Sequence, residues 1–123
     1  MTIICVDDHS IMLKGLLKII QELVPNANIA AYSNADEAMA FAREQGCDVL
    51  ISEIELASVD GLMLAKRMKK LNPQVNIIFN TVCDEREHAK EVMKIKPSGY
   101  LVKPAKKEQI AYELNNLRYA PAI

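Results

Sequence analysis

Five short apolar runs recur along the chain, and most of them are continuous rather than alternating. Continuous runs of about four to eight apolar residues are typical of strands that are covered on both faces of a parallel sheet. The pattern therefore predicts buried strands at Thr2–Val6, Asn28–Tyr32, Asp48–Ser52, Val75–Thr81 and Gly99–Lys103. The second run is the weakest of the set.

Between these runs, apolar residues recur with the 3.6-residue period of amphipathic helices. Pro25 ends the first such segment, Gly46 the second and Asn72-Pro73 the third. Ser33 and Asp36 have the spacing of a capping pair at the start of the second segment. The predicted helices cover Ser10–Val24, the segment between Ser33 and Gly46, about Gly61–Leu71, roughly Glu85–Ile95, and Lys106–Leu117.

Strand and helix alternate throughout the chain, which predicts an α/β fold. Such alternation requires a parallel sheet with helices on both faces, joined by right-handed crossovers. A chain of 123 residues has the size of one domain. We expect residues 1–117 to form this domain and residues 118–123 to be a C-terminal tail or the stub of a linker.

Composition and charge narrow the class of protein. Half of the residues are hydrophobic and a quarter are charged, as in globular domains. The sequence has no apolar run of the ~20 residues that a membrane helix needs, and its start does not resemble a signal peptide. The three cysteines are scattered, which predicts neither a zinc site nor disulfides. We expect a cytoplasmic protein without a membrane partner.

The small net charge of −1 conceals a strong asymmetry. Residues 1–62 hold ten acidic and three basic residues, whereas residues 63–123 hold six acidic and twelve basic ones. This division predicts an acidic pocket and a basic flank on the folded domain. The chain as a whole is not basic enough to indicate a nucleic-acid binder.

Chemically active side chains follow the predicted strands. Asp7 and Asp8 follow the first strand, Glu53 the third and Lys103 the fifth, and Thr81 ends the fourth. Ligands of open α/β sheets bind at the carboxyl ends of the strands, where these side chains should converge. Clustered carboxylates suit a hard cation such as Mg²⁺, while a lysine and a hydroxyl facing it would complete a phosphoryl pocket.

Each of these residues also has an ordinary structural interpretation. Asp8 could cap the first helix, Lys103 could be a solvated lysine, and Thr81 could be a plain strand residue. Their joint occurrence at four appropriate strand ends favours a functional site over four coincidences.

The residues that carry this chemistry resemble those of receiver domains from bacterial two-component response regulators, the CheY-like family. The resemblance extends over residues 2–117. It rests on Asp7-Asp8, on DVLISEIELASVDGL, on NIIFNT and on SGYLVKP, in this order and spacing. Within the family, the chain is similar to receivers that precede a DNA-binding output domain.

The resemblance implies a doubly wound (βα)₅, flavodoxin-like sandwich with a parallel sheet of strand order 2-1-3-4-5. It also implies Mg²⁺-dependent phosphotransfer from a sensor histidine kinase or phosphotransfer protein to the end of the third strand. The implied metal ligands are Asp8, the phosphoacceptor position Glu53 and the backbone carbonyl of Glu55. Thr81 and Tyr100 would be the switch residues and Lys103 the phosphate-pairing lysine, with a cis peptide bond before Pro104.

The chain departs from the family at three positions. Glu53 replaces the phosphoacceptor aspartate, Ala57 replaces a proline, and Val82 replaces a smaller residue that follows the switch hydroxyl. The added methylene of Glu53 extends the carboxylate by ~1.5 Å, toward the place of the phosphoryl group. We therefore expect phosphorylation to be impaired, and Val82 to narrow the space beside Thr81.

Two consequences of Glu53 remain open from the sequence. Its carboxylate could mimic part of the phosphorylated state, or it could pair with Lys103 and lock one state. The chief alternative to a switch is a phosphorylation-independent pseudo-receiver that acts only through protein interactions or dimerisation. A flavin-binding enzyme would need a Ser/Thr/Gly-rich first loop, which DDHSIMLKG does not provide, so we do not expect an enzyme.

The resemblance also implies partners. A homodimer could form through the face of the fourth helix, fifth strand and fifth helix, where charges of both signs lie in the sequence. These are Lys90, Lys94, Lys96, Lys106 and Lys107, with Glu87, Glu91 and Glu108 among them. An ordinary solvated surface would have the same composition. Any DNA binding is expected from an output domain outside these residues.

Overall fold

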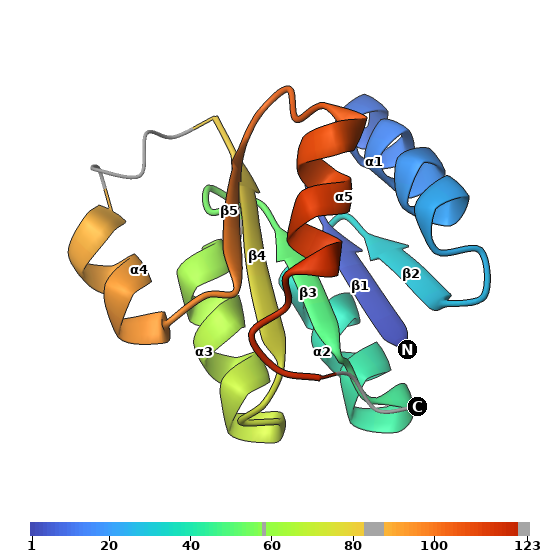
Figure 1. Cartoon of the computed structure of the whole chain (residues 1–123). Coiled ribbons are helices and arrows are strands. Elements are labelled where there is room, and N and C mark those ends of the chain that lie inside the picture. Colours follow the sequence, from blue (N-terminus) through green and yellow to red (C-terminus); the bar gives the residue numbers. More distant parts are fainter. Residues whose placement is uncertain (58, 83–87, 121–123) are drawn as a thin grey trace.

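The computed structural model of the chain describes residues 1–57, 59–82 and 88–120. Their strands form one parallel sheet in the order β2-β1-β3-β4-β5 (Figure 1). The strands are β1 (Thr2–Val6), β2 (Asn28–Tyr32), β3 (Val49–Ser52), β4 (Asn76–Thr81) and β5 (Gly99–Val102). The predicted doubly wound α/β fold and its strand order are confirmed.

Helices cover both faces of this sheet (Figure 1). On one face lie α1 (Ser10–Leu23) and α5 (Lys107–Asn115). On the other lie α2 (Ala35–Gln45), α3 (Gly61–Leu71) and α4 (Ala89–Ile95). Successive side chains of a strand point to opposite faces, so each strand contributes to two separate cores.

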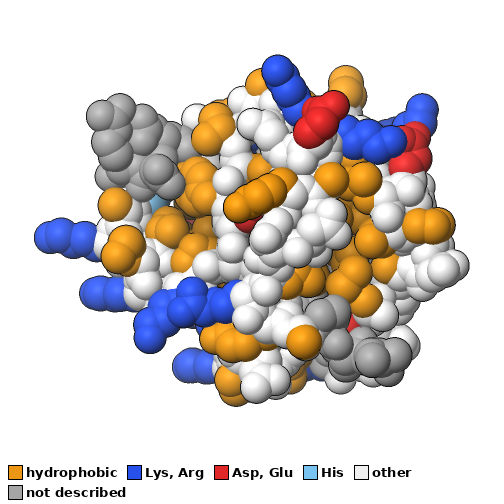
Figure 2. All heavy atoms as spheres, viewed as in Figure 1, with side chains coloured by type: hydrophobic (Ala, Val, Ile, Leu, Met, Phe, Trp, Pro, Cys, Tyr) orange, Lys and Arg blue, Asp and Glu red, His pale blue; other side chains and the backbone are white. Residues whose placement is uncertain are grey.

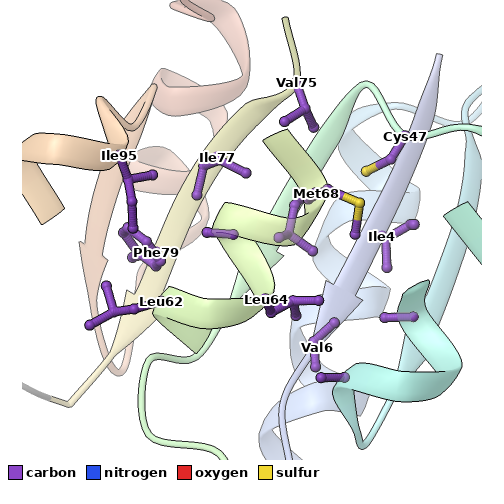
Figure 3. Packing of buried hydrophobic residues seen from close by; sticks show 14 of the residues in the cluster. Ile4, Val6, Cys47, Leu62, Leu64, Met68, Val75, Ile77, Phe79 and Ile95 are labelled. Carbon is purple, nitrogen blue, oxygen red and sulfur yellow. The ribbon is translucent and has the colours of Figure 1, made fainter. Parts of the chain in front are cut away.

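The two cores are built from alternate residues of the same strands. In β1, Ile4 and Val6 belong to the core beneath α2, α3 and α4, whereas Ile3 and Cys5 belong to the core beneath α1 and α5. All four side chains are at most 1% exposed. Figure 3 shows the first of these cores, in which side chains of β1, α3 and β4 lie together. Burial on both faces explains why the strands are continuous apolar runs.

Several element boundaries differ from the predicted ones. The cap of α2 is Asn34 rather than Ser33, because the Asn34 Oδ1 accepts a hydrogen bond from the Glu37 N–H at 2.9 Å. The predicted Ser33–Asp36 pair has the same spacing but lies one residue too early. The bounds of β1, β2 and α3 are as predicted, and α4 begins at Ala89. The remaining strands and helices differ from the predicted bounds by one or two residues at one or both ends, as is usual for frayed ends. Residues 85–87 of the predicted fourth helix lie outside the described residues.

Lysine and arginine side chains gather over the α3 and α4 side of the molecule (Figure 2). The exposed cations of these helices are Lys66, Arg67, Lys70, Lys90 and Lys94. No acidic residue lies in the first turn of α3, and its last turn holds Lys69 and Lys70. The predicted basic flank is therefore located on α3 and α4.

Among the described residues, no helix combines the length and apolarity needed to cross a membrane.

Two cysteine thiols in the interior lead to a prediction about reactivity. Burial raises the pKa of both Cys5 and Cys47 to about 12. Because the thiolate is the reactive form, neither thiol should react with iodoacetamide in the folded protein at mildly alkaline pH. Both should react in denaturant. The test is intact-mass measurement on a Cys83→Ser variant, which removes the remaining thiol; rapid double alkylation without denaturant would contradict the prediction.

Candidate functional site

The carboxyl ends of the central strands bring four polar side chains to one rim of the sheet. Asp7 follows β1, Glu53 follows β3, Thr81 ends β4 and Lys103 follows β5. Their exposed fractions lie between 0% and 9%. A buried rim with two carboxylates, a hydroxyl and an ammonium group is costly unless these groups are paired.

Backbone hydrogen bonds carry the sheet pairing slightly beyond the strands and thereby fix these residues. The Glu53 N–H donates to the Val6 carbonyl at 3.0 Å, and the Lys103 N–H donates to the Thr81 carbonyl at 2.9 Å. Asp7 is held in the same way, by a bond from its N–H to the Tyr32 carbonyl. The site residues are therefore positioned by the sheet itself.

Lys103 is the centre of the buried charges. Its Nζ contacts Asp7 Oδ2 and lies 2.7 Å from Glu53 Oε2. The lysine side chain is 3% exposed and each carboxylate side chain 2%. The structure thus contains the Glu53–Lys103 ion pair that the sequence left as one of two possibilities.

Two opposing effects act on the pKa of Lys103. Burial favours the neutral amine and lowers the pKa, but the hydrogen bonds and negative charges of Asp7 and Glu53 outweigh it. The net result is a pKa above the ordinary value of 10.5. Lys103 is therefore an ammonium ion throughout the neutral range, and its Nζ is shared between the two carboxylates of Asp7 and Glu53.

The second oxygen of Glu53 is also occupied. Its Oε1 accepts hydrogen bonds from the N–H groups of Ile54 at 2.7 Å and Glu55 at 3.3 Å. The Glu53 side chain consequently bends back over the start of its own loop while its other oxygen binds Lys103. Both carboxylate oxygens have partners within the protein.

Gly61 supports the loop that carries Glu53, a role that the sequence did not reveal. A Cβ atom at this position would collide with the backbone carbonyl of Glu53. The Gly61 N–H also donates to the Ile54 carbonyl at 2.6 Å. The residue was expected only to begin the third helix, but it closes the loop tightly against the end of β3.

Asp7, Asp8 and His9 form an acidic corner beside the ion pair. Their ligand atoms lie within 4.8 Å of one another. His9 Nδ1 is 3.2 Å from both Asp7 Oδ1 and Asp8 Oδ1. Apart from this approach of His9, the buried Asp8 Oδ1 has no hydrogen-bond partner among the described residues. The corner could hold a cation, with Asp8 offering a carboxylate oxygen that only the His9 ring approaches.

The two predicted switch residues occupy neighbouring strands. Thr81 is fully buried, and Tyr100 packs edge-on against Phe79 with 6.2 Å between the ring centroids. Val82, the residue after Thr81, is 67% exposed. The Lys103-Pro104 peptide bond is cis, as expected.

A second residue missed by the sequence analysis is Asn80. It is 7% exposed, lines a cavity of about 170 Å³ between α1 and the β5–α5 loop, and has an unpartnered Oδ1 among the described residues. The signal in the sequence was a polar residue inside the apolar run NIIFNT.

Comparison with known proteins identifies the relatives of this chain. The family model described as "Response regulator receiver domain" matches residues 3–115. The uncharacterized transcriptional regulatory protein YesN of Bacillus subtilis (strain 168) is 31% identical over 94% of this chain and 32% of its own length. The transcriptional regulatory protein ZraR of Escherichia coli (strain K12) is 30% identical over 83% of this chain and 23% of its own length.

Solved structures share the fold at lower identity. A response regulator receiver domain protein from Clostridium thermocellum superposes with a TM-score of 0.83 at 22% identity, covering 94% of this chain and 91% of the other. Chemotaxis protein CheY4 of Vibrio cholerae gives 0.83 at 22% identity, covering 93% and 95%. The chain spans from about a quarter to about half the length of the curated relatives it matches.

Proposed function

The chain belongs to the response regulator receiver domain family, and on that premise we propose that it is a receiver module whose phosphoacceptor position is blocked by Glu53. The module would act within a two-component system, as the N-terminal part of a transcriptional regulator. Phosphorylation of the native chain would be impaired, and Glu53 would supply a fixed negative charge in place of the transferred phosphoryl group.

The ion pair between Glu53 Oε2 and Lys103 Nζ, 2.7 Å long and buried, carries this proposal. A receiver that accepts a phosphoryl group needs a free nucleophilic oxygen and a lysine that can turn to the incoming phosphate. Here one oxygen of Glu53 forms an ion pair with Lys103, and the other accepts hydrogen bonds from two backbone N–H groups. Glu53 and Lys103, at the positions where a phosphoryl group would bind, are therefore bound to each other.

We propose that a Mg²⁺ ion binds in part of this site. Asp8 offers a buried oxygen that only the His9 ring approaches among the described residues, and we propose it as the main ligand. Glu53 and the backbone carbonyl of Glu55 are the other proposed ligands, although Glu53 would first have to release a partner. When bound, Mg²⁺ would neutralise charge on phosphoryl oxygens, while Asp7 keeps Lys103 in place.

Glu53 would mimic phosphorylation only in part. It carries one negative charge, whereas a phosphoryl group carries about −1.5 to −2 at neutral pH. We propose that Thr81 and Tyr100 respond to the charge at this position, as switch hydroxyl and switch aromatic. Because the charge of Glu53 is smaller than that of a phosphoryl group, it would shift Thr81 and Tyr100 only part of the way toward their phosphorylated arrangement.

Partners follow from the same proposal. A sensor histidine kinase or phosphotransfer protein would be the upstream partner, and DNA would be reached only through an output domain outside these residues. A homodimer through α4, β5 and α5 is a further proposal, supported by the exposed Met93, Val102 and Tyr112 on that face.

The second candidate function is a phosphorylation-independent interaction module. The closed set of contacts among Asp7, Glu53 and Lys103 favours it, because these residues satisfy one another without any ligand. Mg²⁺ titration discriminates the two. Binding that is lost in an Asp8→Asn variant supports a retained receiver pocket, and absence of binding supports the interaction module.

The native chain should not become phosphorylated. Incubation with a small acyl phosphate and Mg²⁺, followed by intact-mass measurement, should leave the mass unchanged under conditions that fully label a receiver with an aspartate at this position. The physical reason is the misplaced and occupied carboxylate of Glu53. Stoichiometric gain of a phosphoryl group on Glu53 would overturn the proposal.

A further inference from the structure

Beyond α5 the chain continues to the end of the sheet that lies opposite the candidate site. We call the residues Arg118–Ala120 the C-terminal strap. In Figure 1 the dark red trace after α5 runs to the lower ends of the strands, where the strands begin. The strap was expected to be a tail or a linker stub, but it makes specific contacts with three elements of the domain.

The central contact is made by Asn76, the first residue of β4. Its Oδ1 accepts a hydrogen bond from the Tyr119 N–H at 2.8 Å, and its Nδ2 donates to the Tyr119 carbonyl at 2.9 Å. The same Nδ2 lies 3.2 Å from the Asp48 carbonyl. The side-chain amide thus pairs with both the backbone N–H and the backbone carbonyl of a single residue.

Two further contacts hold the strap on either side of this pairing. The Arg118 N–H donates to Ser98 Oγ at 3.0 Å, just before β5. The Lys69 Nζ of α3 lies 5.4 Å from the centre of the Tyr119 ring, in the range of a cation–π contact. The three residues Lys69, Asn76 and Ser98 form what we call the amino-terminal rim.

Asn76 is an unusual residue for its position. It is 1% exposed and lies between Val75 and Ile77, which are both completely buried. A buried primary amide is costly unless its donors and acceptor are paired, and its acceptor is paired here with the strap. Without the hydrogen bonds to the strap, a buried apolar residue at this position would be more stabilising than asparagine.

We propose that the amino-terminal rim is an interaction surface for a short polypeptide segment, with the chain's own strap as its occupant and Asn76 as the residue that selects it. A segment that binds there must offer the backbone N–H and C=O of one residue to Asn76, and the aromatic side chain of that residue to Lys69. The strap therefore belongs to the folded domain. It also holds the departing chain against α3, so that anything attached there takes its orientation from α3 and β4 rather than from the end of α5.

Trypsin provides the test, because the bond between Arg118 and Tyr119 is a tryptic site within the strap. Cleavage requires the strap to leave the rim, so its rate follows the population of the released form. An Asn76→Leu variant, which keeps the side-chain size but loses both hydrogen bonds to Tyr119, should release the peptide beginning at Tyr119 about tenfold faster. Mass spectrometry of early digests measures this release.

An Asn80→Leu variant is the matched control, because it makes the same exchange at the other end of β4 without touching the strap. Release at the native rate in Asn76→Leu, or equal acceleration in Asn80→Leu, would overturn the proposal. If Asn76→Leu does not fold, Ser98→Ala decides, since it removes only the acceptor for the Arg118 N–H. Acceleration in that variant supports the proposal, and an unchanged rate refutes it.

Discussion

Replacing Glu53 by aspartate should raise the rate of phosphoryl labelling about a hundredfold over the native chain. Aspartate is one methylene shorter, so its carboxylate would withdraw by ~1.5 Å from the place where a phosphoryl group must bind. The shorter side chain should no longer hold Lys103 Nζ at 2.7 Å. One oxygen would then be available as nucleophile, and Lys103 would be available to bind a phosphoryl oxygen.

The measurement is a time course of intact mass with an acyl phosphate and Mg²⁺. Glu53→Asn is the matched control, because it has the length of aspartate but no nucleophilic carboxylate. Labelling of Glu53→Asp and not of Glu53→Asn would locate the reaction at this side chain. If Glu53→Asp stays as inert as the native chain, the block lies elsewhere in the pocket, and our account of Glu53 is wrong.

Replacing Lys103 by methionine should reduce the free energy of unfolding by about 3 to 5 kcal/mol. The substitution keeps an apolar stem of similar length but leaves the carboxylates of Asp7 and Glu53 buried beside each other without a cation. Their desolvation and mutual repulsion would no longer be compensated. Urea unfolding at neutral pH, followed by circular dichroism, measures the loss.

Lys107→Met is the control, since it removes a lysine from an exposed pair with Glu22 and should change stability far less. The pH dependence provides a second check. Because the pKa of Lys103 is raised in the folded state, its contribution is fully present below its ordinary value of 10.5 and is lost as the pH rises through the folded value. The stability difference between native chain and Lys103→Met should therefore be constant near neutrality and shrink only in strong alkali. Equal losses in the two lysine variants would contradict this explanation.

The sequence revealed the fold because burial on both faces leaves a simple pattern. The apolar runs around Ile4, Leu50 and Ile78 occupy the central strands, and the residue that follows each strand could be assigned to the rim. The weak run at Asn28–Tyr32 is an edge strand, which explains its mixed pattern. The positions of the strands were therefore predictable to within a residue or two, whereas their order was expected only from the family resemblance.

Contacts between distant residues were not predictable in this way. The bending of Glu53 over the N–H groups that follow it depends on side-chain torsions, and the fit of Gly61 against its carbonyl depends on the path of a loop. Asn76 and Tyr119 are 43 positions apart, and no spacing in the sequence links the two. The cap at Asn34 shows a smaller version of the problem, because two equally spaced polar pairs competed and only backbone geometry decided between them.

The strap has a topological consequence, since it brings the late residues of the chain to the place where the early ones begin. Asp48 Oδ2 accepts a hydrogen bond from the Thr2 N–H at 2.7 Å, while its carbonyl accepts one from Asn76, which holds Tyr119. Thr2 and Tyr119 are thus connected by hydrogen bonds through two intervening residues, and the path of the described chain nearly closes into a ring. A short covalent connection across this gap would close the ring far from Lys103 and Glu53, restricting the unfolded chain while leaving the charged rim as it is.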